Sequence, residues 1–143
     1  MGPGEQGAQV VDGGTFRMLL DFETKKAQRL RYFVSIVCLK VERSNGTPER
    51  FARLLASGIR ATDCVTVRDE RALMLLLIDA EPRDLPGIVE RVMSTLDGKT
   101  WSAGGASFPN TALAPEELLM QAATQQARAE KDGGDRVYVA PSA

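Results

Sequence analysis

The segment from Phe33 to Val41 (FVSIVCLKV) restricts the possible folds more than any other part of the chain. It is almost wholly apolar and rich in β-branched residues, which is typical of a strand buried on both faces. A second apolar run, Ala72 to Ile78 (ALMLLLI), predicts another strand. Strands of this kind must be covered on both sides, so we expect a central sheet with helices packed on it.

The helical and turn signals around these runs predict the remaining elements. Helices are expected over 16–32, from Pro48 with Thr47 as its cap, after a cap at Asp84, and from Pro115 to about Glu130. Short strands are expected at 64–67, 101–106 and 137–139. The order is a helix, then β-α-β-β-α-β, then a helix and a strand. The middle part spells the ferredoxin-like split βαβ motif, so the predicted class is α/β (α+β) with a mainly antiparallel sheet.

Length and composition limit the chain to one domain and exclude several function classes. The 143 residues carry 18 basic and 19 acidic side chains and no histidine. This balance gives no electrostatic reason to bind nucleic acid, and no histidine-dependent triad or metal site is possible. No apolar stretch is long enough to span a membrane. Cys38 and Cys64 lie in apolar runs and are expected to be reduced core thiols, so a cytoplasmic location is predicted.

We expect three regions along the chain. Residues 1–14 are Gly-rich and polar and are predicted to be a disordered N-terminal segment. Residues 15–139 are predicted to form the folded domain, and 140–143 a C-terminal tail.

Several local strings, taken in order, resemble the GGDEF domain of bacterial diguanylate cyclases. Arg60-Ala61-Thr62-Asp63, followed by a hairpin tip, resembles the family's RxxD inhibitory site before its signature turn. Thr100 to Ala106 (TWSAGGA) is similar to the family's T-x-S-x-G-x-A strand. The family's C-terminal pattern is matched at four positions, Ala122, Ala129, Gly133 and Val137. The resemblance covers about residues 15 to 139. It implies a nucleotide-cyclase-like fold, with an extra N-terminal helix and a C-terminal helix and strand around the βαββαβ core.

In the register of this resemblance, the family's catalytic positions carry other residues. Asp69-Glu70-Arg71-Ala72-Leu73 occupies the signature turn, Lys40 the position of a metal-binding aspartate, and Glu130 that of a phosphate-binding lysine. The connection from Arg43 to Thr47 is too short for the family's substrate-holding segment. Phosphoryl transfer depends on a metal and on well-placed cations. The resemblance therefore implies no catalytic residue, no metal and no cofactor, and it predicts that the chain is not an enzyme.

Arg60 and Asp63 are retained where the family's inhibitory site binds cyclic di-GMP, and Arg91 matches a family arginine that completes such a site, often from a neighbouring domain. An arginine can bond phosphate or guanine, and a carboxylate can accept from guanine N–H groups. The resemblance implies a cyclic di-GMP receptor, with a homodimer or another protein as its partner.

Other interpretations remain open. Arg60 and Asp63 could be an exposed ion pair and Arg91 a solvated helix residue. The chain would then be an interaction scaffold that binds no nucleotide. A GTP-using enzyme is a third hypothesis, against which Lys40 and Glu130 argue.

Overall fold

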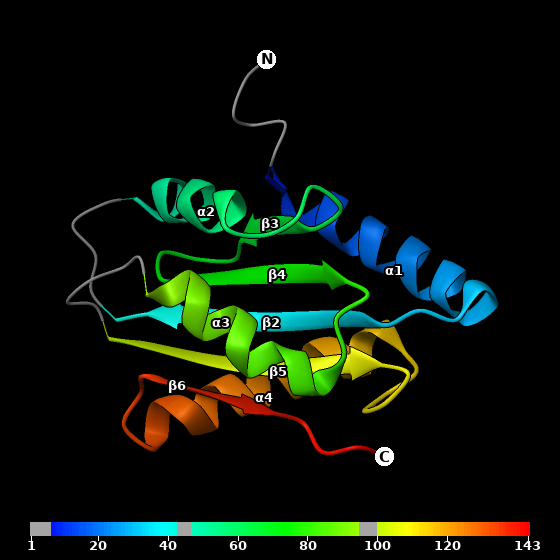
Figure 1. Ribbon diagram of the computed structural model, residues 1–143. Coiled ribbons are helices and arrows are strands. Elements are labelled where there is room, and N and C mark those ends of the chain that lie inside the picture. Colours follow the sequence, from blue (N-terminus) through cyan, green and yellow to red (C-terminus); the bar gives the residue numbers. More distant parts are fainter. Residues whose placement is uncertain (1–6, 43–46, 95–99) are drawn as a thin grey trace.

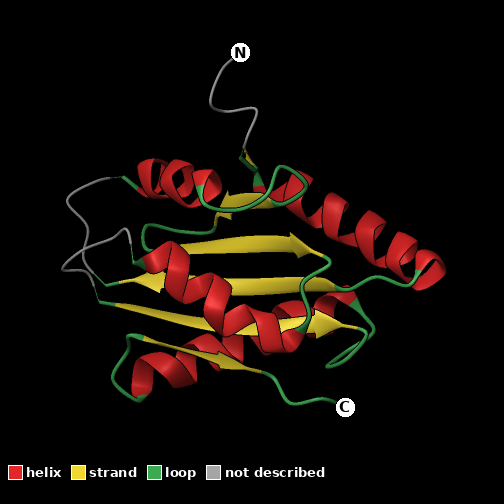
Figure 2. Ribbon diagram, viewed as in Figure 1, coloured by secondary structure: helices red, strands yellow, loops and turns green. Residues whose placement is uncertain are grey.

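The computed structural model of the chain describes residues 7–42, 47–94 and 100–143. A mixed sheet lies between two layers of helices (Figure 2). The strands are β1 (Gln9–Val11), β2 (Val34–Val41), β3 (Cys64–Val67), β4 (Ala72–Ile78), β5 (Trp101–Phe108) and β6 (Arg136–Val139). The helices are α1 (Gly13–Leu30), α2 (Pro48–Ser57), α3 (Leu85–Met93) and α4 (Pro115–Lys131), with a 3-10 turn η2 (Pro82–Asp84) before α3.

The sheet has the strand order β1-β3-β4-β2-β5-β6 (Figure 1). Its centre is antiparallel: Val34 of β2 pairs with Ile78 of β4 on one side and with Phe108 of β5 on the other. β3 is antiparallel to β4, whereas the outer strands β1 and β6 run parallel to their neighbours. The predicted βαββαβ core is confirmed as β2-α2-β3-β4-α3-β5, and so is the mainly antiparallel sheet.

Side chains of β2 alternate between two separate cores, which explains why its sequence is apolar on both faces. Val37, Leu39 and Val41 pack under α2 and α3 with Leu55 and Val89. The residues between them face the other side, where α1 and α4 lie. That second core contains Phe16, Leu20, Val34, Ile36, Cys38 and Leu118. Cys38 and Cys64 are buried free thiols, as predicted.

The helices begin and end at the residues that the sequence signals marked, although one of the three signals acts differently from the prediction. The Thr47 hydroxyl accepts the N–H of Arg50 at 3.2 Å, and Pro48 begins α2. Gly133 and Gly134 have φ values of 113° and 74°, a region that glycine enters without strain, and they end α4. Asp84 occupies the N-cap position of α3, as predicted, but its side chain forms no capping bond to that helix. Its carboxylate instead accepts the N–H of Glu81 at 3.0 Å and closes the η2 turn.

The prediction of a disordered segment over residues 1–14 is wrong for its second half. β1 pairs with β3, and the Ala8 N–H donates to the Ala56 carbonyl at 2.9 Å. Asp12 caps α1, because its carboxylate accepts the N–H of Thr15 at 2.7 Å. The sequence signal was weak because β1 is short and its partner lies far along the chain. Residues 1–6 lie outside the described residues, as does most of the short connection predicted between β2 and α2.

The strand β5 lies unusually close to α4. A Cβ atom added at Gly104 would lie 2.1 Å from the backbone nitrogen of Gln126 and 2.3 Å from the carbonyl oxygen of Ala122. The glycine-thinned strand was predicted to allow such an approach, and the partner is the backbone of α4.

Helix α1 ends in a strained residue. Arg31 adopts the left-handed conformation (φ 62°, ψ 56°) and donates its N–H to the Ala27 carbonyl at 2.7 Å. This conformation costs a residue with a Cβ atom about 1 kcal/mol or more, and helices usually end this way on glycine. No helix among the described residues is long and apolar enough to cross a membrane.

Candidate ligand-binding site

The turn between α2 and β3 is built around Asp63. One carboxylate oxygen accepts the N–H of Arg60 at 3.0 Å, and the other accepts the N–H of Ile78 at 2.8 Å. The Asp63 N–H donates in turn to the Arg60 carbonyl at 2.9 Å. These bonds fasten the turn to the end of β4. The side chain of Asp63 is only 3% exposed, so it faces the protein and not the solvent.

Burial changes the acidity of this carboxyl group. Removal from water raises the pKa of Asp63 above its ordinary value of 3.8, because it penalises the charged form. The N–H groups of Ile78 and Arg60 and the Arg60 charge act in the opposite direction and offset part of the rise.

Arg60 points the other way. Its side chain is 61% exposed, and its guanidinium donates to the Ile78 carbonyl. Its Nε lies 3.9 Å from the nearer Asp63 oxygen, a loose contact compared with the backbone bonds of that carboxylate. The predicted Arg60–Asp63 pair is therefore close in space, but its two side chains differ in accessibility.

Arg91 reaches the same region from α3. Its guanidinium lies 3.4 Å from the Gly58 carbonyl, at the end of α2. Arg60, Asp63 and Arg91 all line one open cleft of about 700 Å³ beside the loop from β4 to α3. This volume is within the range of sites that take small molecules. The structure thus brings the three predicted residues together, with two arginines exposed and the aspartate buried.

The sequence analysis missed further charged residues of this cleft, which we call the Arg60 cleft. Arg83 projects from the η2 turn with its side chain 81% exposed, and it is 3.2 Å from Glu81. Asp79 and Asp84 are exposed at its wall. Their sequence signal was weak, because isolated charged residues beside a turn usually indicate a solvated surface.

A second polar cluster lies where the β3–β4 hairpin turns. The Asp69 carboxylate accepts the N–H groups of Arg71 and Ala72, each at 2.9 Å, and thereby shapes the predicted tip. Lys40 of β2 and Glu130 of α4 form an ion pair of 2.7 Å. Their opposite charges lie at the two positions that the resemblance assigns to a metal ligand and a phosphate-binding lysine.

Glu130 interacts with a second neighbour, Glu42, as well as with Lys40. Hydrogen bonding to Glu130 raises the pKa of Lys40, and Glu130 also raises the pKa of Glu42. Among the described residues no group of three or more acidic or thiol side chains is placed to hold a metal. An ammonium group does not fit Mg²⁺, which binds oxygen ligands, so Lys40 does not supply a metal ligand at this position.

Comparison with known proteins shows the fold clearly. No family model matches the sequence, and no curated protein does. Solved GGDEF domains do match the structure. The GGDEF domain of YfiN from Pseudomonas aeruginosa has a TM-score of 0.83 at 15% identity, covering 92% of this chain and 90% of that one. The GGDEF domain of DgcB from Caulobacter crescentus, in complex with c-di-GMP, has a TM-score of 0.75 at 13% identity, covering 93% and 90%.

A third match corrects one prediction. The active GGEEF domain of a diguanylate cyclase from Vibrio cholerae has a TM-score of 0.74 at 14% identity, covering 86% of this chain and 94% of that one. The prediction that the chain is not an enzyme is contradicted, because its fold is shared with solved cyclase domains, one of them described as active. Lys40, Glu130 and the hairpin tip differ from the residues of the family that the sequence resembles. These differences do not establish that the chain is inactive. The chain has the fold of a GGDEF domain.

Proposed function

We propose that this chain is a signalling domain that binds cyclic di-GMP in the Arg60 cleft. The observation that carries the proposal is that Arg60 of the turn before β3 and Arg91 of α3 line one open cleft with exposed side chains. The GGDEF domain of DgcB, which shares the fold, was solved with this ligand. Guanidinium groups suit both parts of such a ligand, since they form paired bonds to phosphate and stack on bases.

The burial of Asp63 changes the role we assign to it. With both oxygens accepting backbone N–H groups, Asp63 would fix the turn from which Arg60 projects. Asp79 and Asp84 are exposed in the same cleft, and each carboxylate can accept from guanine N–H groups. Arg60 and Arg91 are thus the proposed phosphate and base contacts, and Asp63 is a positioning residue.

Calorimetric titration of the wild-type chain with cyclic di-GMP tests the proposal, with GMP as a control for nonspecific nucleotide binding. We expect saturable heat with cyclic di-GMP and a much weaker response to GMP. Arg91→Ala should weaken binding by about tenfold or more, the usual loss for a hydrogen bond to a charged group. A flat wild-type titration at high-micromolar ligand would reject the proposal and favour the interaction scaffold.

A further inference from the structure

A separate pocket lies on the opposite face of the sheet from the Arg60 cleft. It has a volume of about 440 Å³ and is formed by the end of α1, the loop into β2 and the loop after β5. Ala27 and Phe108, which line it, belong to the core under α1 and α4. Both loops lie at the end of the sheet where β2 begins and β5 ends (Figure 1).

The lining is aromatic and apolar, as in many sites for small ligands. Tyr32, Phe33 and Phe108 supply rings, and Pro109 and Leu113 supply further apolar surface. Leu113 is 69% exposed, so it forms part of the rim of the pocket that solvent reaches. The Tyr32 hydroxyl is bonded to the Glu23 carboxylate at 2.7 Å, so its polar end is already satisfied.

In the described part of the chain, Arg31 is the only charged residue that lines this pocket. No carboxylate lines it, and Arg31 forms no ion pair with any residue that the structure describes. The Gln28 amide is the other polar group of the wall. The carboxylates of Glu23 and Asp79 lie beside this wall, but they are bonded to Tyr32 and Phe33 and not to Arg31. The pocket therefore combines an apolar interior with one guanidinium group at its wall that is not tied up in an ion pair.

The backbone of Arg31 supplies an independent observation. This residue occupies the left-handed conformation in which helices usually place glycine. An arginine there destabilises the folded chain, and strained residues of this kind concentrate at ligand sites. An arginine at this position has a physical reason if its guanidinium group binds a ligand in the pocket.

We propose that this pocket binds a small amphipathic anion: a flat apolar ring system held among Tyr32, Phe33 and Phe108, with one anionic group bonded by Arg31. The charge and the aromatic lining together favour this class over neutral or cationic ligands. The proposal does not depend on cyclic di-GMP binding, because the two sites share no lining residue.

The test is a fluorescence titration with 8-anilinonaphthalene-1-sulfonate, a flat aromatic probe with a single sulfonate. We expect one saturable site on the wild-type chain. Arg31→Gly removes the guanidinium group and also the strain of the left-handed backbone conformation. The variant should therefore fold at least as well as wild type, and its affinity for the probe should fall by about tenfold or more. Leu113→Glu places a negative charge at the exposed rim of the pocket, and it should lower the affinity for the probe by a similar factor.

Two controls locate the binding. Arg29→Ala removes an exposed cation of the same helix outside the pocket, and Arg60→Ala removes one from the other cleft. Both should leave the probe's affinity within about twofold of wild type, since they leave the Arg31 bond intact. The proposal is overturned if the wild-type chain shows no saturable signal, if Arg31→Gly binds as tightly as wild type, or if Arg60→Ala abolishes binding.

Discussion

The backbone N–H of Asp79 donates to the carbonyl of Phe33 at 2.6 Å. Asp79 lines the Arg60 cleft on one face of the sheet, and Phe33 lines the aromatic pocket on the other. The Phe33 N–H donates in return to the Asp79 carboxylate at 3.4 Å, so two hydrogen bonds join the walls of the two cavities.

Asp79 itself is held in the left-handed conformation, with φ of 58°. An alanine is strained there, whereas a glycine is not, so Asp79→Gly should be more stable than Asp79→Ala by about 1 kcal/mol. Urea denaturation of both variants measures the difference. Equal stabilities would show that this backbone conformation carries no penalty.

Replacing Asp63 should destabilise the fold. The Asp63 carboxylate is buried, and Asp63→Ala leaves the two N–H groups that it accepts without a partner. We therefore expect the free energy of unfolding to fall by about 1–3 kcal/mol. Asp69→Ala is the matched control, because that carboxylate also accepts two backbone N–H groups but at an exposed hairpin tip. Water can replace its bonds, and the loss should be clearly smaller. Equal losses would contradict the clamping role of Asp63.

The raised pKa of Asp63 predicts a pH dependence of stability. The folded chain favours the protonated form, so this group's contribution is greatest below its ordinary pKa of 3.8. It is lost as the pH rises through the higher pKa of the folded state. Urea denaturation of wild type and Asp63→Asn at several pH values isolates this effect. The stability advantage of wild type over the variant should shrink as the pH rises through that window, and a growing advantage would show that the pKa is lowered.

The Lys40–Glu130 ion pair should contribute modestly. Both side chains are about one-third exposed, so a double-mutant cycle with Lys40→Ala and Glu130→Ala should give a coupling of about 0.5–1 kcal/mol that falls with added salt. In the Arg17–Asp21 pair, 3.1 Å apart within α1, both side chains are more exposed, so this pair provides the comparison and should couple less. No coupling at low salt would mean that the contact does not stabilise the fold.

Close packing of β5 on α4 makes Gly104 intolerant of any side chain. Gly104→Ala should lower the free energy of unfolding by at least about 1–3 kcal/mol. The new methyl group would clash with backbone atoms of α4, which can move only if the helix shifts. Gly87 in α3 has nothing within 4 Å of an added Cβ, so Gly87→Ala should raise stability by about 0.5–1 kcal/mol. Thermal unfolding of the two variants measures these opposite shifts.

The sequence predicted the elements whose signals are local. The apolar strands β2 and β4, the Thr47 cap and the Gly133-Gly134 helix end all appear at the expected residues. The paired element β1 was missed, because its stability comes from β3, which lies far along the chain. Long-range pairing of a short, partly polar strand leaves no periodic pattern in its own sequence.

The sequence predicted which residues meet at the candidate site but not how each is placed. Arg60 and Asp63 of the RxxD string line the same cleft as Arg91, and ligand binding there stays a prediction. The burial of Asp63 was not predicted, because carboxylates usually lie at the surface and only the contact with the Ile78 N–H reveals why this one does not. The aromatic pocket was also missed, since residues near Arg31 and Phe108 meet only in three dimensions.

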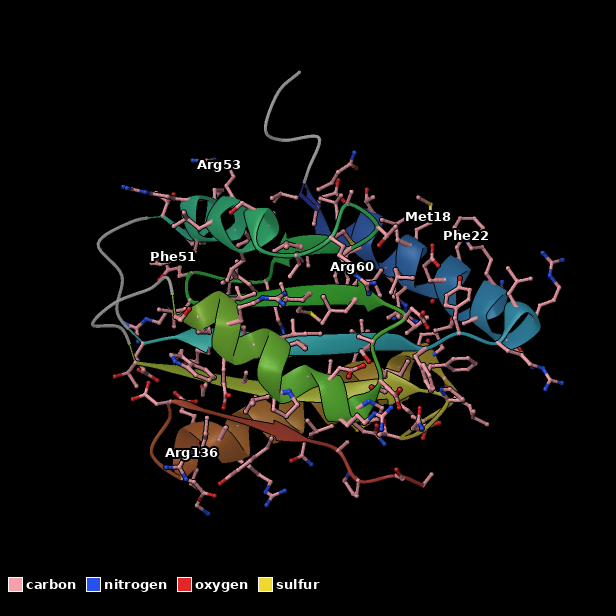
Figure 3. All side chains as sticks on the ribbon, viewed as in Figure 1. Met18, Phe22, Phe51, Arg53, Arg60 and Arg136 are labelled. Atoms are coloured by element: carbon pink, nitrogen blue, oxygen red, sulfur yellow. The ribbon has the colours of Figure 1, made fainter. Side chains whose placement is uncertain are left out.

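The central claim is most directly tested by comparing Arg60→Ala with Arg53→Ala in the cyclic di-GMP titration. Arg53 is an exposed arginine of α2 that points away from Arg60 (Figure 3), so its removal changes net charge equally without touching the cleft. The account predicts that Arg60→Ala weakens binding by about 10- to 150-fold while Arg53→Ala binds like wild type. Equal affinities for the two variants would contradict it.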